Sequence, residues 1–126
     1  MTIEFFGKTL SGPFTMPSGI VTTAPSIIQY VFDHMPEVGV VTTKSIGLAP
    51  RLGYREPVLS QYAPGCFVNA VGLTNPGPEA SREILAGLKV PADRFLLTSI
   101  FGGTVEEFVM SRKPHSHRPL AFEIYR

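Results

Sequence analysis

The segment Val38–Thr43 constrains the fold of this chain more than any other part of the sequence. It reads Val-Gly-Val-Val-Thr-Thr, and every residue except Gly39 is β-branched. β-Branched residues favour extended backbone. A strand that is apolar on both faces has to be covered on both, as the parallel strands of α/β proteins are. The sequence therefore predicts a buried parallel strand at this position.

Two further extended segments precede this strand. Ile3–Leu10 alternates apolar and polar side chains around Gly7-Lys8, which predicts a small β-hairpin with its turn at those two residues. Phe14–Pro17 is a short apolar run that ends at Ser18-Gly19, and it predicts a first buried strand.

Three segments carry helical patterns. Ser26–His34 and Thr104–Val109 each begin with a hydroxyl residue followed three positions later by Gln29 or Glu107, which is a capping-box pattern. Pro78–Leu88 begins with a proline, which suits the first turn of a helix, and its apolar residues recur on one face. We predict a helix for each segment.

Extended segments alternate with these helices. Phe95–Ile100 predicts a third apolar strand, and Phe67-Val68 a short strand at the far end of an irregular loop, Arg51–Gln61. Strand and helix thus alternate, which predicts an α/β fold with right-handed parallel crossovers. The N-terminal half of a (β/α)₈ TIM barrel with an N-terminal β-hairpin fits this order, and so does a small doubly wound sheet.

The last part of the chain, residues 111–126, has a different composition. Ser111–Pro119 contains two prolines and no apolar face where a helix would continue, so we expect it to be weakly ordered. Leu120–Tyr125 predicts a fourth strand. His115 and His117 lie close together, but no carboxylate or cysteine cluster accompanies them, and we predict no metal site.

Charge and cysteine content narrow the classes of function. Eleven basic and ten acidic residues give a net charge of +1, so no strong field attracts nucleic acid or an anionic membrane. The single cysteine, Cys66, excludes an internal disulfide, and its small and apolar neighbours predict a packed, inert thiol. The sequence shows neither a secretory signal nor an apolar run long enough to span a membrane. We expect a cytoplasmic protein.

Candidate functional residues follow the predicted strands, where barrel enzymes carry their active sites. Lys44 follows Val38–Thr43 and can stabilise negative charge on a flavin or a carboxylate, although a lysine at a strand exit is also often only solvated. Asn69–Gly77 offers an amide that can donate to and accept from a heterocycle; otherwise it is an irregular loop. Ser18-Gly19 lets a planar cofactor approach the backbone, or forms only a turn.

Taken together, these segments resemble the dihydroorotate dehydrogenases, especially the class 1 enzymes. The resemblance covers Ile3–Val109. Its motifs are, in chain order, Val40-Val-Thr-Thr-Lys-Ser45, Pro50-Arg-Leu-Gly53, Asn69-Ala-Val-Gly-Leu-Thr-Asn-Pro-Gly77 and Gly102-Gly-Thr-Val-Glu-Glu-Phe108. The second and third motifs are the most specific.

The resemblance implies a barrel with FMN at its top that oxidises dihydroorotate to orotate in pyrimidine biosynthesis. It implies that FMN contacts Ser18, Gly19, Lys44 and Ser45. It implies that the substrate contacts Lys44, Asn69, Val71, Gly72 and Leu73. In one class 1 subtype it also implies an iron–sulfur flavoprotein subunit that passes electrons to NAD. The unpaired strand edges of an open barrel favour self-association, so we expect a homodimer.

The chain departs from the family in length and in its last segment. Residues 1–110 are family-like and 111–126 are divergent, with Tyr125 in the place of an expected asparagine. The family's catalytic base, its second flavin lysine and its phosphate-binding loops lie beyond the matching segment, and a barrel needs roughly 250 residues. Three interpretations stay open: a truncated dihydroorotate dehydrogenase, a non-catalytic half-barrel that self-associates through its strand edges, and a flavin domain related to dihydropyrimidine dehydrogenase.

Overall fold

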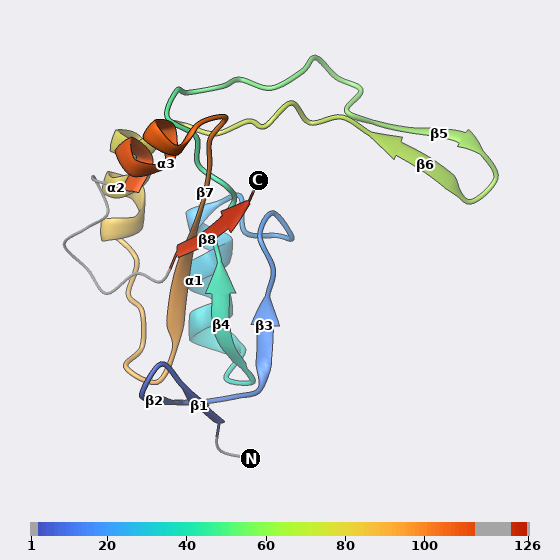
Figure 1. Ribbon diagram of the computed structural model, residues 1–126. Helices are drawn as coiled ribbons and strands as arrows, with labels where there is room; N and C mark the ends of the chain where they lie inside the picture. The colour runs from blue at the N-terminus through green and yellow to red at the C-terminus, as the bar shows by residue number, and fades with distance from the viewer. Residues whose placement is uncertain (1–2, 113–121, 126) are drawn as a thin grey trace.

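The structure, a computed structural model that describes residues 3–112 and 122–125, is built around a four-stranded parallel sheet. A helix follows each of the first three strands of this sheet, and two antiparallel hairpins lie outside it (Figure 1). In chain order the described elements are β1 (Ile3–Phe5), β2 (Lys8–Leu10), β3 (Phe14–Met16), α1 (Pro25–His34), β4 (Val38–Thr42), β5 (Leu59–Ala63), β6 (Cys66–Asn69), α2 (Pro78–Ala86), β7 (Phe95–Phe101), α3 (Val105–Arg112) and β8 (Phe122–Tyr125).

The sheet confirms the predicted α/β class. Its strands lie in the order β3-β4-β7-β8, and each neighbouring pair is parallel. The spatial order therefore repeats the chain order, without the reversal that a doubly wound sheet requires. This arrangement is the one expected of part of a (β/α)₈ barrel, although the described strands do not close into one.

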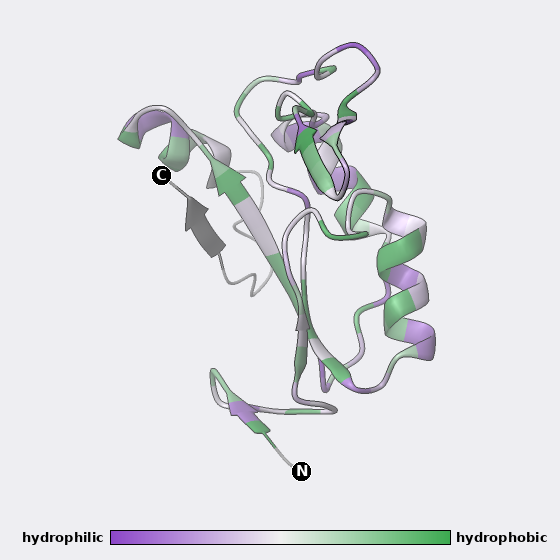
Figure 2. Ribbon diagram, turned by 90° about the vertical axis from the view of Figure 1, so that its right-hand side faces the viewer, coloured by the Kyte–Doolittle hydropathy of each residue, from purple (hydrophilic) through white to green (hydrophobic). Residues whose placement is uncertain are grey.

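The prediction of a buried strand at Val38–Thr43 is confirmed. β4 is buried at every residue from Val38 to Thr42 and lies between β3 and β7. Figure 2 shows α1 running alongside the sheet, with hydrophobic and hydrophilic residues alternating along the helix. The main cluster of buried apolar side chains joins these elements and α2: Ile28, Val31, Phe32, Val38, Val41, Ile46, Leu85, Leu88 and Leu96. Burial of each such side chain contributes about 1.5–3 kcal/mol to folding.

The first strand of the sheet is less buried than its sequence predicts. β3 ends at Met16, and the side chain of Phe14 is 63% exposed. Among the described strands β3 lies at the edge of the sheet, with β4 as its one neighbour. An apolar pattern identifies a strand, but it does not show whether a second strand covers its other edge.

The capping box predicted at the start of α1 is wrong. The helix begins with Pro25 in its first turn, after Ala24, and no side chain caps it. The Gln29 amide instead donates to the Asp33 carboxylate at 2.9 Å and accepts from the Lys89 backbone N–H at 2.8 Å. Gln29 therefore ties α1 to the segment before β7 rather than to its own N-terminus.

The C-terminus of α1 is capped by a residue from far along the chain. The Arg94 side chain is 7% exposed, and its Nη1 donates to the carbonyl oxygens of Val31 and Met35, both at 3.1 Å. Its Nε has no hydrogen-bond partner among the described residues. A buried cation at this position satisfies two carbonyls and interacts favourably with the negative end of the helix dipole.

The N-terminal hairpin lies across the amino ends of the sheet strands (Figure 1). It is confirmed as β1 and β2, but its turn is at Phe6-Gly7, because Lys8 is already in β2. The Lys8 amine lies 4.5 Å from the centre of the Phe95 ring and donates to the Arg94 carbonyl at 3.4 Å. Leu10 is buried. The hairpin is therefore anchored to the start of β7.

An extended arm, residues 51–75, separates β4 from α2 and projects from the body as the green and yellow segment of Figure 1. The short strand predicted at Phe67-Val68 is confirmed as part of β6, but the loop predicted over Arg51–Gln61 is partly wrong, because it contains the start of β5. β5 and β6 pair with each other and are exposed at nearly every residue.

The later elements follow their predictions with shifted ends. α2 begins at Pro78 as predicted and ends at Ala86. The Thr104 hydroxyl accepts from the Glu107 N–H at 3.3 Å, which confirms one half of the second capping box, although α3 continues to Arg112. The Glu107 carboxylate accepts from the Gly103 N–H at 2.6 Å rather than from the N–H of Thr104. β8 confirms the fourth strand. His115 and His117 lie outside the described residues.

Candidate functional site

Three serine hydroxyls meet at the carboxyl ends of β3, β4 and β7. The Ser45 oxygen lies 3.2 Å from that of Ser18 and 2.8 Å from that of Ser99. Ser18 and Ser45 are half-buried, and Ser99 is fully buried. Because all three strands are parallel, residues far apart in sequence converge at this edge, where parallel α/β proteins bind their ligands.

Backbone hydrogen bonds to β7 fix the segment that follows β4. The N–H of Thr43 donates to the Leu97 carbonyl at 2.9 Å, and the N–H of Ile46 donates to the Ser99 carbonyl at 2.9 Å. The Ser99 N–H donates in turn to the Thr43 hydroxyl at 3.2 Å. Lys44 and Ser45 are thus held in place between two anchored residues.

Gly19 brings the chain after β3 close to Lys44. Its φ of +77° is one that residues with a side chain rarely adopt. A Cβ at this position would lie 3.6 Å from the Lys44 amine. The Gly19 N–H donates to the buried Thr22 hydroxyl at 3.0 Å, and the Lys44 N–H donates to the Thr22 carbonyl at 3.3 Å. Ser18, Gly19, Lys44 and Ser45 therefore form one group.

The Lys44 side chain is half-buried, and no carboxylate of residues 3–111 lies within 4.0 Å of its amine. A half-buried ammonium without a counter-ion attracts an anionic ligand or a developing negative charge. Together with the three serine hydroxyls it forms a cluster of polar groups beside the backbone of Gly19. This combination suits a planar, carbonyl-rich ring.

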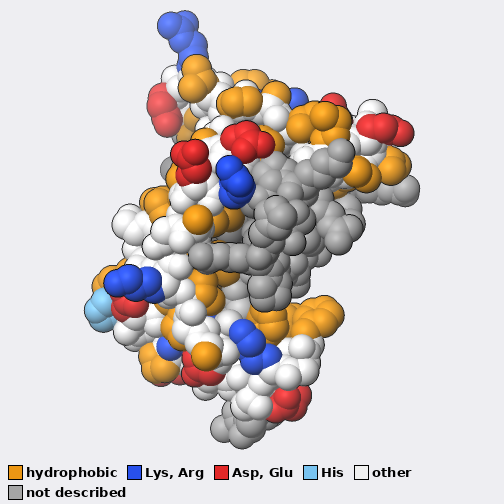
Figure 3. Space-filling model, turned by 90° about the vertical axis from the view of Figure 1, so that its left-hand side faces the viewer, with side chains coloured by type: hydrophobic (Ala, Val, Ile, Leu, Met, Phe, Trp, Pro, Cys, Tyr) orange, Lys and Arg blue, Asp and Glu red, His pale blue; other side chains and the backbone are white. Residues whose placement is uncertain are grey.

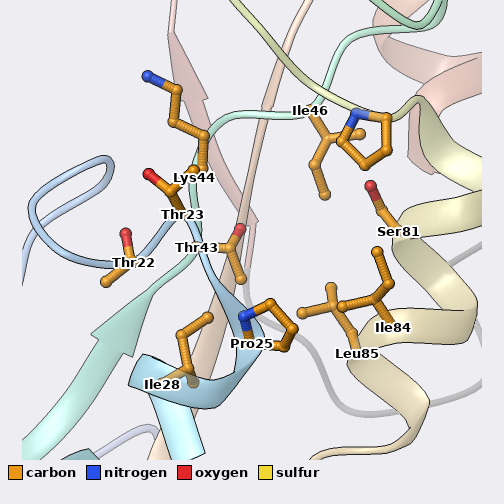
Figure 4. Close-up of a pocket in the computed structure, with 11 residues that line it drawn as sticks. Thr22, Thr23, Pro25, Ile28, Thr43, Lys44, Ile46, Ser81, Ile84 and Leu85 are labelled. Carbon is orange, nitrogen blue, oxygen red and sulfur yellow. The ribbon is translucent and has the colours of Figure 1, made fainter.

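A pocket lies beside this group, between α1, α2 and the end of β4 (Figure 4). The pocket is open to solvent. Figure 4 shows that the Lys44 amine points away from Ile84 and Leu85, so its charge is not directed toward that wall of the pocket. The lining residues are Thr22, Thr23, Pro25, Ile28, Thr43, Lys44, Ile46, Pro76, Ser81, Ile84 and Leu85.

Apart from Lys44, the residues predicted to bind substrate form a second group, in the arm. Asn69 is exposed at the end of β6. The Val71 carbonyl accepts from the Tyr54 N–H at 3.0 Å, and a side chain at Gly72 would overlap Tyr54. Leu73 is 50% exposed with a φ of +54°. In the described part of the chain, no hydrogen bond joins these residues directly to Lys44 or Ser45.

Asn75 connects the two groups, and sequence reasoning did not single it out. Its side chain is hydrogen-bonded to Gly47, which follows the Lys44 segment, and to Leu73. Ser99 was missed as well. A serine inside the apolar run Phe95–Phe101 is the signal that marks it, because a polar residue in a buried strand requires a partner.

The exposure of Cys66 contradicts another sequence expectation. Cys66 is exposed at the start of β6, so the expectation of a packed thiol is wrong. Its apolar neighbours share a hairpin that is itself solvent-exposed. Within residues 3–111, no three His, Cys, Asp or Glu side chains lie close enough to hold a metal ion.

The surface carries no dominant charge on the side shown in Figure 3, where acidic and basic side chains are interspersed with apolar ones. This mixture agrees with the net charge of +1. No helix in residues 3–112 is long and apolar enough to cross a membrane.

Parallel strands in chain order, the first three each followed by a helix, with polar side chains gathered at their carboxyl ends, define part of a (β/α)-barrel unit. A family model described as dihydroorotate dehydrogenase matches residues 1–118. The chain belongs to the dihydroorotate dehydrogenase family, whose members are oxidoreductases.

Similar proteins agree with this assignment. The chain is 36% identical over 124 residues to a protein of Pyrococcus abyssi, 38% over 122 residues to one of Pyrococcus furiosus, and 37% over 124 residues to one of Thermococcus kodakarensis. All three are named dihydroorotate dehydrogenase B (NAD⁺), catalytic subunit. The matches cover 97–98% of this chain and 39–40% of those proteins. The chain thus spans about 40% of the length of the curated relatives it matches.

Proposed function

We propose that this chain contributes the FMN- and substrate-binding half of a dihydroorotate-oxidising site. The observation that carries the proposal is the convergence of Ser18, Gly19, Lys44 and Ser45 at one edge of the parallel sheet. Their donors match the carbonyl oxygens and ring nitrogens of an isoalloxazine, and Gly19 leaves the backbone open to a flat ring.

In this proposal each residue has a separate task. The backbone of Ser18 and Gly19 lies against the flavin and Ser45 lies beside it. The Lys44 ammonium contacts both the flavin and the carboxylate of the substrate. Asn69 and the backbone of residues 71–73 hydrogen-bond the pyrimidine. FMN, when bound, supplies the acceptor for the hydride that leaves one ring carbon. The neighbouring carbon loses a proton to a base, a role that we assign to none of the described residues.

A visible absorption spectrum tests the proposal. The purified protein, supplied with FMN, is expected to show a flavin spectrum that bleaches when dihydroorotate is added without oxygen. Lys44→Met should weaken orotate binding at least tenfold, because about 1.4 kcal/mol of charge pairing corresponds to that factor. Lys89→Met, at an exposed lysine, is the matched control and should leave orotate affinity unchanged. A colourless protein that binds no added FMN would support a non-catalytic half-barrel instead.

We also propose two protein partners. The names of the relatives denote a catalytic subunit that uses NAD⁺, and this supports an iron–sulfur flavoprotein subunit that carries electrons to NAD⁺. A second copy of the chain is the other partner. Every residue from Pro57 to Pro78 is uncharged, so two arms can meet without like-charge repulsion. A cytoplasmic location fits the free thiol of Cys66.

A further inference from the structure

We propose that Asn75 is a positioning residue that locks the arm to the loop carrying Lys44 and Ser45. The inference rests on the proposed function, in which that loop binds the flavin and the arm binds the pyrimidine. Asn75 lies between β6 and α2, where the arm returns to the body, and its side chain is 6% exposed. A buried amide is stable only when its donors and acceptors are satisfied.

The Asn75 side chain joins three separate points of the backbone. Its Oδ1 accepts from the N–H of Gly47 at 3.2 Å and from the N–H of Gly77 at 3.0 Å. Its Nδ2 donates to the Leu73 carbonyl at 2.9 Å. Gly47 lies 28 residues earlier, in the loop after β4. One side chain thus links that loop, the inner end of the arm and the start of α2.

The backbone of Asn75 adds a fourth connection, to the outgoing strand of the arm. Its N–H donates to the Arg51 carbonyl at 3.0 Å, and the Arg51 N–H donates to the Asn75 carbonyl at 2.8 Å. The outgoing and returning segments of the arm are therefore both fixed at this one residue. Beyond it, β5 and β6 are exposed at nearly every position, so the direction of the arm depends on its base.

The loop at the other end of the link is itself rigid. The Ile46 N–H donates to the Ser99 carbonyl at 2.9 Å, and the Phe101 N–H donates to the Ile46 carbonyl at 3.0 Å. Gly47 is the next residue, so Asn75 accepts a hydrogen bond from a backbone already anchored on β7. The hydrogen bonds of Asn75 therefore fix Leu73 and the arm relative to the edge of the sheet.

An asparagine suits this place better than its near relatives. Oδ1 has two lone pairs for two N–H donors, and Nδ2 supplies a donor for a carbonyl. An aspartate would keep both acceptors but would direct negative charge at the Leu73 carbonyl. An alanine would leave the Gly47 and Gly77 N–H groups buried without partners, which is the costly outcome for a hydrogen-bond network.

Hydrogen exchange of individual amides tests the lock. In Asn75→Ala we expect the amides of Gly47, Gly77 and Tyr54 to exchange at least about tenfold faster. The amides of Val41 and Leu97, in β4 and β7, should keep their rates. Gln61→Ala, an exposed position in β5, is the control and should leave all five rates unchanged. Unchanged rates at Tyr54, or equal acceleration at all five amides, would overturn the proposal.

Asn75→Asp keeps the test decisive if Asn75→Ala does not fold. The carboxylate still accepts from Gly47 and Gly77, so those two amides should stay protected. Loss of the donor to Leu73 should accelerate exchange at Tyr54, whose N–H donates to Val71 in the adjoining segment. An exchange rate of the Tyr54 amide equal to that in the unaltered protein would overturn the proposal.

The affinities for two ligands then distinguish a positioning role of Asn75 from a general contribution to stability. Titration of Asn75→Ala with FMN and orotate should show orotate affinity reduced about tenfold or more and FMN affinity changed less than about threefold, because misplacement of the arm affects one ligand. Equal losses for both ligands would overturn the positioning role. If the unaltered protein binds neither ligand, the proposed function fails, whereas the exchange rates still decide whether Asn75 locks the arm.

Discussion

The hydroxyl oxygens of Ser45 and Ser99 lie 2.8 Å apart, although 54 residues separate the two serines in the sequence. This contact crosses from the loop after β4 to the carboxyl-terminal half of β7 and continues to Ser18 at 3.2 Å. It therefore fixes, relative to one another, the ends of three parallel strands. Lys44 precedes Ser45 in the chain, so the same contact fixes the backbone from which the Lys44 side chain extends.

Ser99→Ala should destabilise the protein modestly. Ser99 is fully buried, and its loss removes one hydrogen bond while Ser45 keeps Ser18 as a partner. We expect the free energy of unfolding to fall by about 1 kcal/mol, measured by urea denaturation. Ser60→Ala, at an exposed position of β5, is the control, with an expected change below about 0.5 kcal/mol. Equal effects of the two substitutions would contradict a structural role for the Ser45–Ser99 contact.

Gly47→Ala should destabilise the loop after β4. A Cβ at Gly47 would overlap the ring of Phe101, and overpacking of this kind costs about 1–3 kcal/mol. Adding Phe101→Leu should recover part of the loss, because the smaller side chain makes room, and a double-mutant cycle measures the coupling. Gly87→Ala is the matched control. Its φ is −76°, so we expect stabilisation of about 0.4–1 kcal/mol. Additive effects of the first two substitutions would refute the overlap.

Arg94→Ala should be among the most damaging single substitutions outside the apolar core. It removes the two hydrogen bonds that cap the C-terminus of α1 and the packing of a buried side chain. We expect a loss of about 2–4 kcal/mol in the free energy of unfolding. Arg82→Ala provides the comparison. Arg82 forms an exposed pair with Glu79 at 3.8 Å, and its loss should cost less than about 0.5 kcal/mol. Similar midpoints of urea denaturation for the two variants would mean that the Arg94 cap of α1 contributes little to stability.

The arm should control self-association. Tyr62 and Phe67 are 73% and 60% exposed on β5 and β6. The paired substitution Tyr62→Glu and Phe67→Glu places like charges on both arms of a dimer, so sedimentation analysis should show monomers. Tyr30→Glu, at a residue of α1 that is 58% exposed, should leave the dimer intact. An unaltered protein that sediments as a monomer would exclude the dimer itself.

Patterns within single elements were good predictors of structure. The β-branched run at Val38–Thr43 indicated the buried strand β4, and proline at position 78 marked the start of α2. Errors arose where a pattern had two physical outcomes. Ser26 and Gln29 have the spacing of a capping box, yet Gln29 bonds Asp33 and Lys89, because tertiary partners outcompeted the local one. Cys66 has apolar neighbours but lies on an exposed hairpin.

The sequence by itself determined the α/β class, the family, and the identities of Ser18, Gly19, Lys44 and Ser45 as candidate ligands, because periodicity and motif spacing are properties of short segments. The tertiary structure alone decided that Ser99 completes that group and that Asn75 ties it to the arm. These contacts join residues 28 and 54 positions apart. They depend on strand register and on the path of the connecting loops, which no local pattern of side chains specifies.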